Sequence, residues 1–156
     1  MLTNFDQLGS DAYVWIFGIS PVLDADAQAD VLRQVDGFLS QWASHGTPVV
    51  GARDLREGSF LIIAADARSE RSGCSIDRMF GTLRELEQRH KIQILDANRV
   101  FFREDGAGVR AVPRAQFREV ATEETIVFDT TAETLNDIRS GSWEKPASES
   151  WHRQLL

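Results

Sequence analysis

The sequence predicts an α+β protein with a ferredoxin-like core, followed by a C-terminal α/β extension and a tryptophan-bearing tail. Two apolar runs, residues 13–19 and 60–65, are rich in β-branched and aromatic residues and suit the central strands of a sheet. Two stretches with apolar residues at helical spacing follow these runs. The resulting order, βαββαβ, is the split βαβ pattern of ferredoxin-like proteins.

The first half of this core is expected to be a strand, a long helix and a hairpin. Asp24 is a candidate N-cap for the helix, and Gly46 is the glycine at which a left-handed turn would end it. Four apolar residues lie on one face of the helix: Val31, Val35, Phe38 and Trp42. A weaker strand begins at residues 49–50, and the turn at residues 57–59 joins it to the strand at 60–65.

The second half adds a helix and a fourth strand. Five apolar residues give this helix its buried face: Ile76, Met79, Phe80, Leu83 and Leu86. The helix should end near His90, and residues 99–103 form the last strand, closed by a turn at 104–108. In a ferredoxin-like sheet, the strand at 13–19 would lie between the strands at 60–65 and 99–103.

The C-terminal extension is predicted to pack on this core rather than to form a separate unit. It contains a short helix at 113–120, a strand at 125–128, a helix at 132–138 and a tail with Trp143 and Trp151, which we expect to dock on the body. No linker separates the parts. The chain is therefore interpreted as one domain, 1–156, with the core at about 13–104 and the extension at about 109–156.

Composition excludes several classes of function. The chain carries 24 acidic and 17 basic residues, a net charge of −7, which disfavours nucleic-acid or anionic-membrane partners. No glycine-rich loop presents a lysine to phosphate, and one cysteine with three scattered histidines gives no metal-ligand spacing, so no cofactor and no metal is expected. The lone cysteine, the short apolar runs and the absence of a signal-like start predict a cytoplasmic protein.

One segment suggests chemistry. Cys74 lies where a polar loop enters the second helix, and unpaired N–H groups and the helix dipole favour a thiolate there. In the predicted topology the first helix finishes at the same end of the sheet, which would bring His45 toward the thiol as a base or ion-pair partner. Asp77 would orient the imidazole. Cys74, His45 and Asp77 are therefore the candidate catalytic residues of a cysteine-dependent hydrolase, transferase or thiol-redox protein.

Two other interpretations stay open. A lone cysteine also serves as a small packing residue, His45 as a charge at a helix end and Asp77 as a charge in a first helical turn. The alternative function is a non-catalytic protein-binding or assembly module, which would hold a protein partner on a sheet face or on the tail. Across the two functions, the expected partner is an unknown small molecule or protein. Exposure of Cys74 beside His45 favours the enzyme, whereas burial of Cys74 favours the module.

Several segments carry a resemblance to a known family. They are Trp-Ala-Ser-His-Gly-Thr-Pro at 42–48, Ser-Gly-Cys-Ser-Ile-Asp at 72–77, Thr-Ile-Val-Phe at 125–128, Trp-Glu-Lys-Pro at 143–146 and Ser-Trp-His at 150–152. Over residues 14–156 the chain resembles a family of small uncharacterised bacterial proteins that often bear the automatic label "ABC transporter ATPase". The resemblance implies no particular activity, and without a Walker A lysine the residues give the ATPase label no support.

Overall fold

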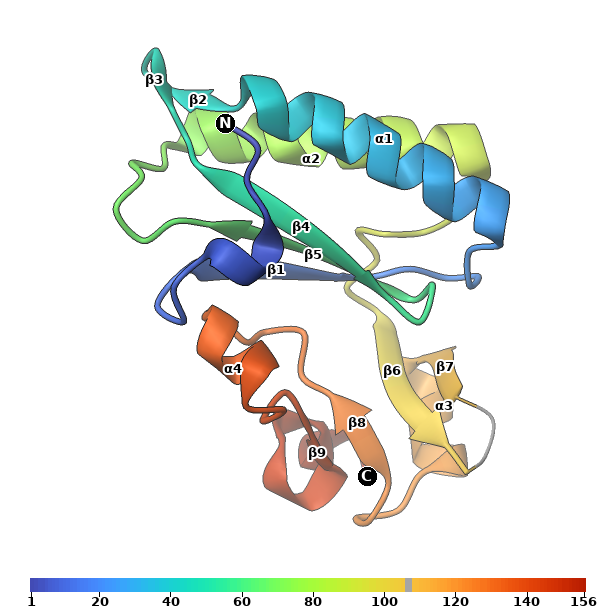
Figure 1. The fold of residues 1–156 in the computed structure, drawn as a ribbon. Helices are drawn as coiled ribbons and strands as arrows, with labels where there is room; N and C mark the ends of the chain where they lie inside the picture. Colours follow the sequence, from blue (N-terminus) through green and yellow to red (C-terminus); the bar gives the residue numbers. More distant parts are fainter. Residues whose placement is uncertain (106–107) are drawn as a thin grey trace.

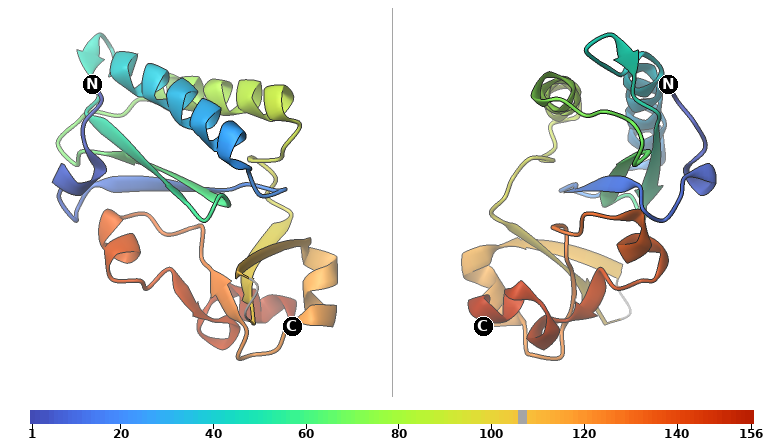
Figure 2. Two further views of the ribbon diagram at one scale, coloured as in Figure 1. Left: turned by 45° about the vertical axis from the view of Figure 1, so that its right-hand side comes forward. Right: turned by 90° about the vertical axis from the view of Figure 1, so that its left-hand side faces the viewer.

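Two helices cover one face of a three-stranded antiparallel sheet in the computed structural model, which describes residues 1–105 and 108–156. Helices α1 (Ala25–Gln41) and α2 (Gly73–His90) lie side by side over strands β1 (Tyr13–Gly18), β5 (Phe60–Ala65) and β4 (Gly51–Arg56), as Figure 1 shows. The strand order is β1-β5-β4. The opposite face packs on the C-terminal part of the chain (Figure 2).

The C-terminal part is built on a second antiparallel sheet. Its order is β7-β6-β8-β9, with strands β6 (Arg99–Glu104), β7 (Gly108–Pro113), β8 (Ile126–Phe128) and β9 (Glu144–Pro146). The short elements around the two sheets are η1 (Phe5–Gln7), β2 (Ala43–Ser44), β3 (Thr47–Pro48), α3 (Arg114–Val120), α4 (Leu135–Arg139), η2 (Ala147–Glu149) and η3 (Trp151–Leu155).

Local sequence signals explain where the two long helices begin. The Asp24 side chain accepts a hydrogen bond from the Ala27 N–H, which confirms its predicted role as the N-cap of α1. Helix α2 begins with a capping box in which Ser72 and Ser75 each accept the other's backbone N–H. It ends, as predicted, at His90, because Lys91 adopts the left-handed conformation.

The mixed α/β class is confirmed, but the sheet expected of a ferredoxin-like core is not formed. The arrangement β1-β5-β4 agrees with the first three strands of the prediction. Strand β6 was expected beside β1, and it pairs instead with β7 and β8. Strand β7, which the sequence analysis missed, gives β6 a hairpin partner of six residue pairs, and this local pairing replaces the long-range one.

The end of the first helix also differs from the prediction. Helix α1 ends at Gln41, and Trp42 is already extended because its side chain turns into the core, where its indole N–H donates to the Ser75 carbonyl at 2.9 Å. Gly46 does have a positive φ of 80°, but it lies in the turn between β2 and β3. His45 is therefore in a hairpin turn and not in the last turn of a helix.

The extension contains the predicted helix and strand as α3 and β8, and the helix expected at 132–138 is the shorter α4. Of the turn predicted at 104–108, residues 106 and 107 lie outside the described residues. Trp143 is 3% exposed and Trp151 is half-buried, which confirms that both tail tryptophans dock on the body.

A shared apolar cluster joins the first sheet to the C-terminal part. Phe60 of β5 contacts three aromatic rings from that part, with ring centroids 5.3 Å from Phe101, 4.6 Å from Phe128 and 5.0 Å from Trp143. Residues of both parts cover these side chains, so the cluster would be exposed in either part alone. Within residues 1–105 and 108–156, no helix combines the length and the apolar character needed to cross a membrane.

Candidate functional sites

Cys74 is the second residue of α2, and its side chain is exposed. The capping box uses the N–H groups of Ser72 and Ser75. The N–H groups of Gly73 and Cys74 have no acceptor among the residues that the structure describes. Two free backbone donors and the positive end of the helix dipole therefore lie beside the thiol, as the sequence predicted.

The other two predicted residues lie in the same region but do not form a catalytic group with Cys74. The Nε2 atom of His45 is 4.0 Å from Oε1 of Glu70, and both side chains are largely exposed. Asp77 is exposed on α2. In the described part of the chain, no hydrogen bond joins the Cys74 thiol to His45 or Asp77. Strand β2, which ends just before His45, contacts α2, but among the described residues no hydrogen bond joins a histidine to the thiol.

Two arginines of the loop before α2 are engaged by other side chains. Arg68 forms an ion pair with Asp66 at 3.1 Å and is directed into solvent. Arg71 packs over the ring of Tyr13, with its guanidinium carbon 4.3 Å from the ring centroid. Arg71, three residues before Cys74, is therefore held near the start of α2.

A second region was not predicted from the sequence, and it lies at the open edge of β1. Val14 donates its N–H to the loop before α4 at 2.9 Å, and Ser20 donates to the connection after α2 at 3.0 Å. Alternate residues of a strand direct their backbone groups to the same side, so Ile16 and Gly18 face this edge too. No partner is found for their outward N–H and C=O groups among residues 1–105 and 108–156.

A cavity of about 230 Å³ lies along this open edge, where the two parts of the molecule meet. We call it the junction cavity. Its walls come from β1, the connection between α2 and β6, β6 itself, the start of α3, the loop after β8, and the tail. The lining residues are Ile16, Phe17, Gly18, Ile94, Leu95, Asp96, Ala97, Arg99, Phe101, Arg114, Thr130, Thr131 and Trp151.

Trp151 brings an unpaired hydrogen-bond donor to this region. Its indole N–H is buried and has no partner in the described part of the chain. Its ring stacks on His152, with centroids 4.0 Å apart, and the guanidinium of Arg114 lies over it at 4.9 Å. The Trp151 ring therefore lines the cavity, while its N–H is covered by neighbouring protein atoms.

His152 fixes the position of Trp151 rather than serving as a proton donor. The imidazole is 2% exposed, and its Nδ1 is 2.6 Å from the Ser150 hydroxyl. Burial lowers the pKa of His152 from 6.5 to about 4, so the ring is neutral at pH 7. A neutral ring held between Ser150 and Trp151 keeps the indole at the cavity wall.

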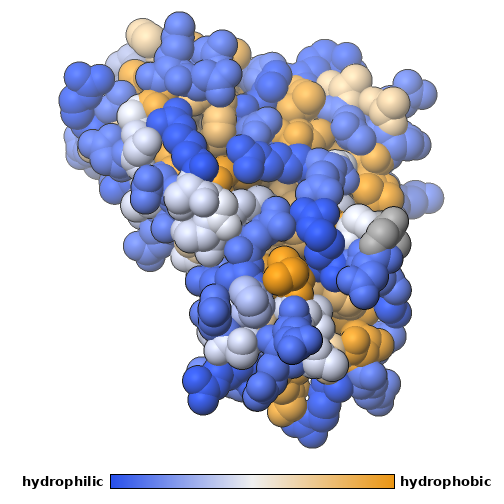
Figure 3. Space-filling model, turned by 60° about the horizontal axis from the view of Figure 1, so that its bottom comes forward, coloured by the Kyte–Doolittle hydropathy of each residue, from blue (hydrophilic) through white to orange (hydrophobic). Residues whose placement is uncertain are grey.

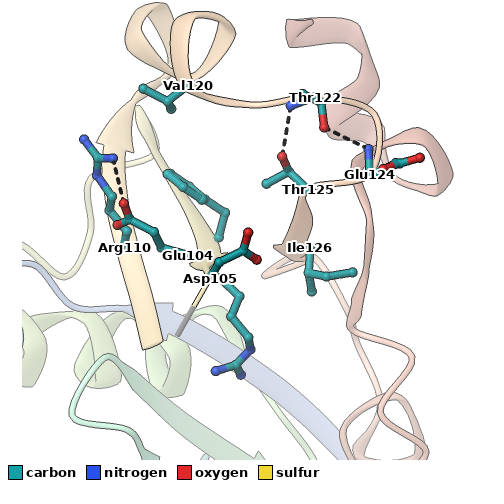
Figure 4. Close-up of a pocket in the computed structure, with 10 residues that line it drawn as sticks. Glu104, Asp105, Arg110, Val120, Thr122, Glu124, Thr125 and Ile126 are labelled. Carbon is teal, nitrogen blue, oxygen red and sulfur yellow. Dashed lines mark hydrogen bonds and ion pairs between the residues drawn. The ribbon is translucent and has the colours of Figure 1, made fainter. Parts of the chain in front are cut away.

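A wider cleft of about 450 Å³ lies where β6 and β8 diverge (Figure 4). Its polar groups bind one another: Arg110 lies 3.5 Å from Glu104, and the Thr122 N–H donates to the Thr125 hydroxyl at 2.9 Å. The Glu124 N–H donates in turn to the Thr122 hydroxyl. These groups are satisfied within the protein, whereas the exposed Asp105 and Glu124 also line the cleft.

Comparison with family models, with curated proteins and with solved structures finds no match for this chain. Within the part of the chain that the structure describes, no group of three or more His, Cys, Asp or Glu side chains is placed to hold a metal ion. The sequence analysis noticed Trp151 but missed Gly18, Arg114 and Thr130. Only Gly18 carried a local signal, since a glycine inside a strand often marks a close approach of another group.

Proposed function

We propose that the protein is a non-catalytic binding module and that its ligand occupies the junction cavity. The observation that carries the proposal is the set of unmet hydrogen bonds in one place. The outward peptide groups of Ile16 and Gly18 lack protein partners among the described residues, and both residues line the cavity. A bound molecule that satisfies them recovers the cost of leaving them unpaired.

A small ligand fits this surface better than a large protein partner. On the face shown in Figure 3, apolar side chains lie in small separate groups among hydrophilic ones. The large exposed apolar residues in the described part of the chain lie in three places: Met1 and Leu2 at the N-terminus, Val22 before α1, and Val120 at the end of α3. A protein interface needs a contiguous apolar centre, so the cavity is the better candidate.

We also propose a cytoplasmic location and membership of a bacterial protein family. A single free cysteine and an acidic composition support a cytoplasmic location without nucleic-acid partners. The segments around Cys74 and in the tail support membership of the bacterial family that the sequence resembles.

The test uses N-acetyl-leucinamide, a neutral probe of amino-acid size with both amide donors and acceptors, titrated into ¹⁵N-labelled protein. We expect saturable chemical-shift changes at the backbone amides of Ile16 and Gly18. Ala97→Trp, at the cavity rim, should abolish them, whereas Ala115→Trp, exposed on α3 and outside the cavity, should not. The absence of a saturable change at the cavity, with this amide and with the corresponding acid, would overturn the proposal.

A second candidate function is thiol–disulfide exchange at Cys74, favoured by the exposed thiol with two free N–H groups beside it. The Cys74 thiolate would attack one sulfur of a small disulfide, the S–S bond would break, and the second sulfur would leave as a thiolate. This reaction consumes no general base, which agrees with the absence, among the described residues, of a hydrogen bond between Cys74 and His45.

This candidate is tested with glutathione disulfide as the oxidant and mass spectrometry as the readout. We expect one glutathionyl group on the native protein and none on Cys74→Ser. The rate should fall in Arg71→Gln and stay constant in Arg84→Gln, which alters an exposed arginine further along α2. A native rate no higher than that of the protein in urea would show that the fold does not activate Cys74, and the candidate would be rejected.

A further inference from the structure

We infer that the occupant of the junction cavity is a small carboxylate that also carries an amide, the chemical class of N-acyl amino acids. This inference rests on the proposed function, because it names the ligand of the same cavity. Three properties of the lining residues lead to it: the cationic charge of Arg114, an open strand edge, and apolar walls around a small volume.

The first property is the charge of the lining. Arg114 has no ion pair in residues 1–105 and 108–156, and its guanidinium lies at the cavity above the Trp151 ring. The carboxylate of Asp96, the acidic residue in the wall, already binds Arg99 at 3.2 Å. One cation is therefore left without a counterpart. A ligand carboxylate provides two oxygens, which could accept from the Arg114 guanidinium.

The second property is the edge of β1. Ile16 and Gly18 present N–H and C=O groups two residues apart on the same side of the strand. A ligand amide is the group that matches such an edge, since it donates one hydrogen bond and accepts another in the geometry of a neighbouring strand. A simple fatty acid would leave these groups unpaired, so the edge favours an acylated amino acid.

The third property is size and apolar character. A molecule of liquid water occupies roughly 30 Å³, so a cavity of about 230 Å³ has the volume of about eight water molecules. Leu95 and Phe101 supply apolar contacts to the wall. The space therefore fits one aliphatic or aromatic side chain.

The experiment compares N-acetyl-leucine with N-acetyl-leucinamide, which differs only by replacing the carboxylate with a neutral amide. We expect the acid to bind about tenfold more tightly at pH 7 in low salt, measured by NMR titration of the Trp151 indole N–H and the Gly18 amide. Arg114→Gln should remove this preference, and Arg118→Gln, which changes an exposed arginine on the same helix, should keep it.

The outcomes separate the two proposals. If the acid and the amide bind with equal affinity and both shift the Gly18 amide, the inference of a carboxylate ligand is wrong, but the proposed binding function stands. Binding of the acid that is unchanged in Arg114→Gln would also overturn the inference of a carboxylate. Failure of both probes to bind would overturn the proposed function as well. A thermal-unfolding measurement on each variant checks that it is folded.

Discussion

The ring of Phe101 lies where a side chain on Gly18 would have to be. A Cβ atom at Gly18 would overlap the edge of this ring, so the strand must carry a glycine at this position. The contact packs β6 on the face of β1 that is turned toward the C-terminal part, through a side chain rather than through backbone hydrogen bonds.

Gly18→Ala should lower the free energy of unfolding by about 1 to 3 kcal/mol, the usual cost of overpacking a core. Gly37→Ala is the matched control, because a Cβ at this position on α1 meets no atom and alanine is the better helix former. The control should leave stability unchanged or raise it by about 0.5 to 1 kcal/mol. Urea unfolding measures both. Equal effects of the two substitutions would contradict the assigned contact.

A double variant tests the partner directly. Phe101→Leu should make room for the new methyl group, so Gly18→Ala combined with Phe101→Leu should lose less stability than the sum of the single changes. Additive losses would mean that the clash involves another residue.

The sequence predicted most helices and strands correctly because their signals are local. Asp24 and the Ser72 capping box set the starts of the long helices, and the apolar runs of β1 and β5 need burial on both faces. The pairing of β6 was predicted wrongly, because two strands, β1 and β7, could pair with it. Strand β7 has no continuous apolar run, so the sequence did not reveal it as a partner. The choice between two such partners is decided by tertiary contacts such as the one between Phe101 and Gly18.

The candidate sites also differ in how far local sequence determines them. Cys74 could be located from sequence because a helix start is a local feature, whereas the position of His45 depended on where α1 ends, and Trp42 ends it early. The junction cavity could not be predicted, because Arg114 and Trp151 reach it from distant parts of the chain. Only the fold brings these residues together with the edge of β1.

Trp42→Phe tests the contact that holds the end of α1 against the start of α2. The substitution removes the buried hydrogen bond to the Ser75 carbonyl, so it should cost about 1 to 3 kcal/mol in the free energy of unfolding. Trp143→Phe makes the same change in volume at a residue that is equally buried but whose indole makes no hydrogen bond to the described residues. Thermal unfolding should show a larger loss for Trp42→Phe; equal losses would assign the effect to volume alone.

The ion pairs of Arg103 join the two parts of the molecule. Its guanidinium binds both carboxylate oxygens of Glu57, at 3.0 and 3.1 Å, and one of Glu144 at 3.2 Å. Arg103 lowers the pKa of Glu57. A double-mutant cycle with Arg103→Gln and Glu57→Gln should give a coupling of about 1 kcal/mol, because the pair is bidentate but partly exposed. The coupling should shrink in 1 M salt, and a coupling that salt leaves unchanged would rule out an electrostatic origin.

His152 should make the stability of the protein depend on pH in a defined window. Burial lowers the pKa of His152 in the folded state to about 4, while the unfolded chain keeps the ordinary value near 6.5. Below pH 6.5 the unfolded state binds a proton that the folded state does not. The contribution of His152 is therefore complete above pH 6.5, and it is lost as the pH falls toward 4.

At about 1.4 kcal/mol for each pH unit between the two values, the loss is roughly 3 kcal/mol at most. Urea unfolding at pH 7.5 and pH 4.5 measures it, and His152→Gln provides the comparison. The variant should be less stable at pH 7.5, because glutamine fills the buried site poorly, yet it should lose less stability than the native protein between the two pH values. If native protein and variant lose the same amount, the proton is taken up elsewhere, and His152 is then not the group that destabilises the fold in acid.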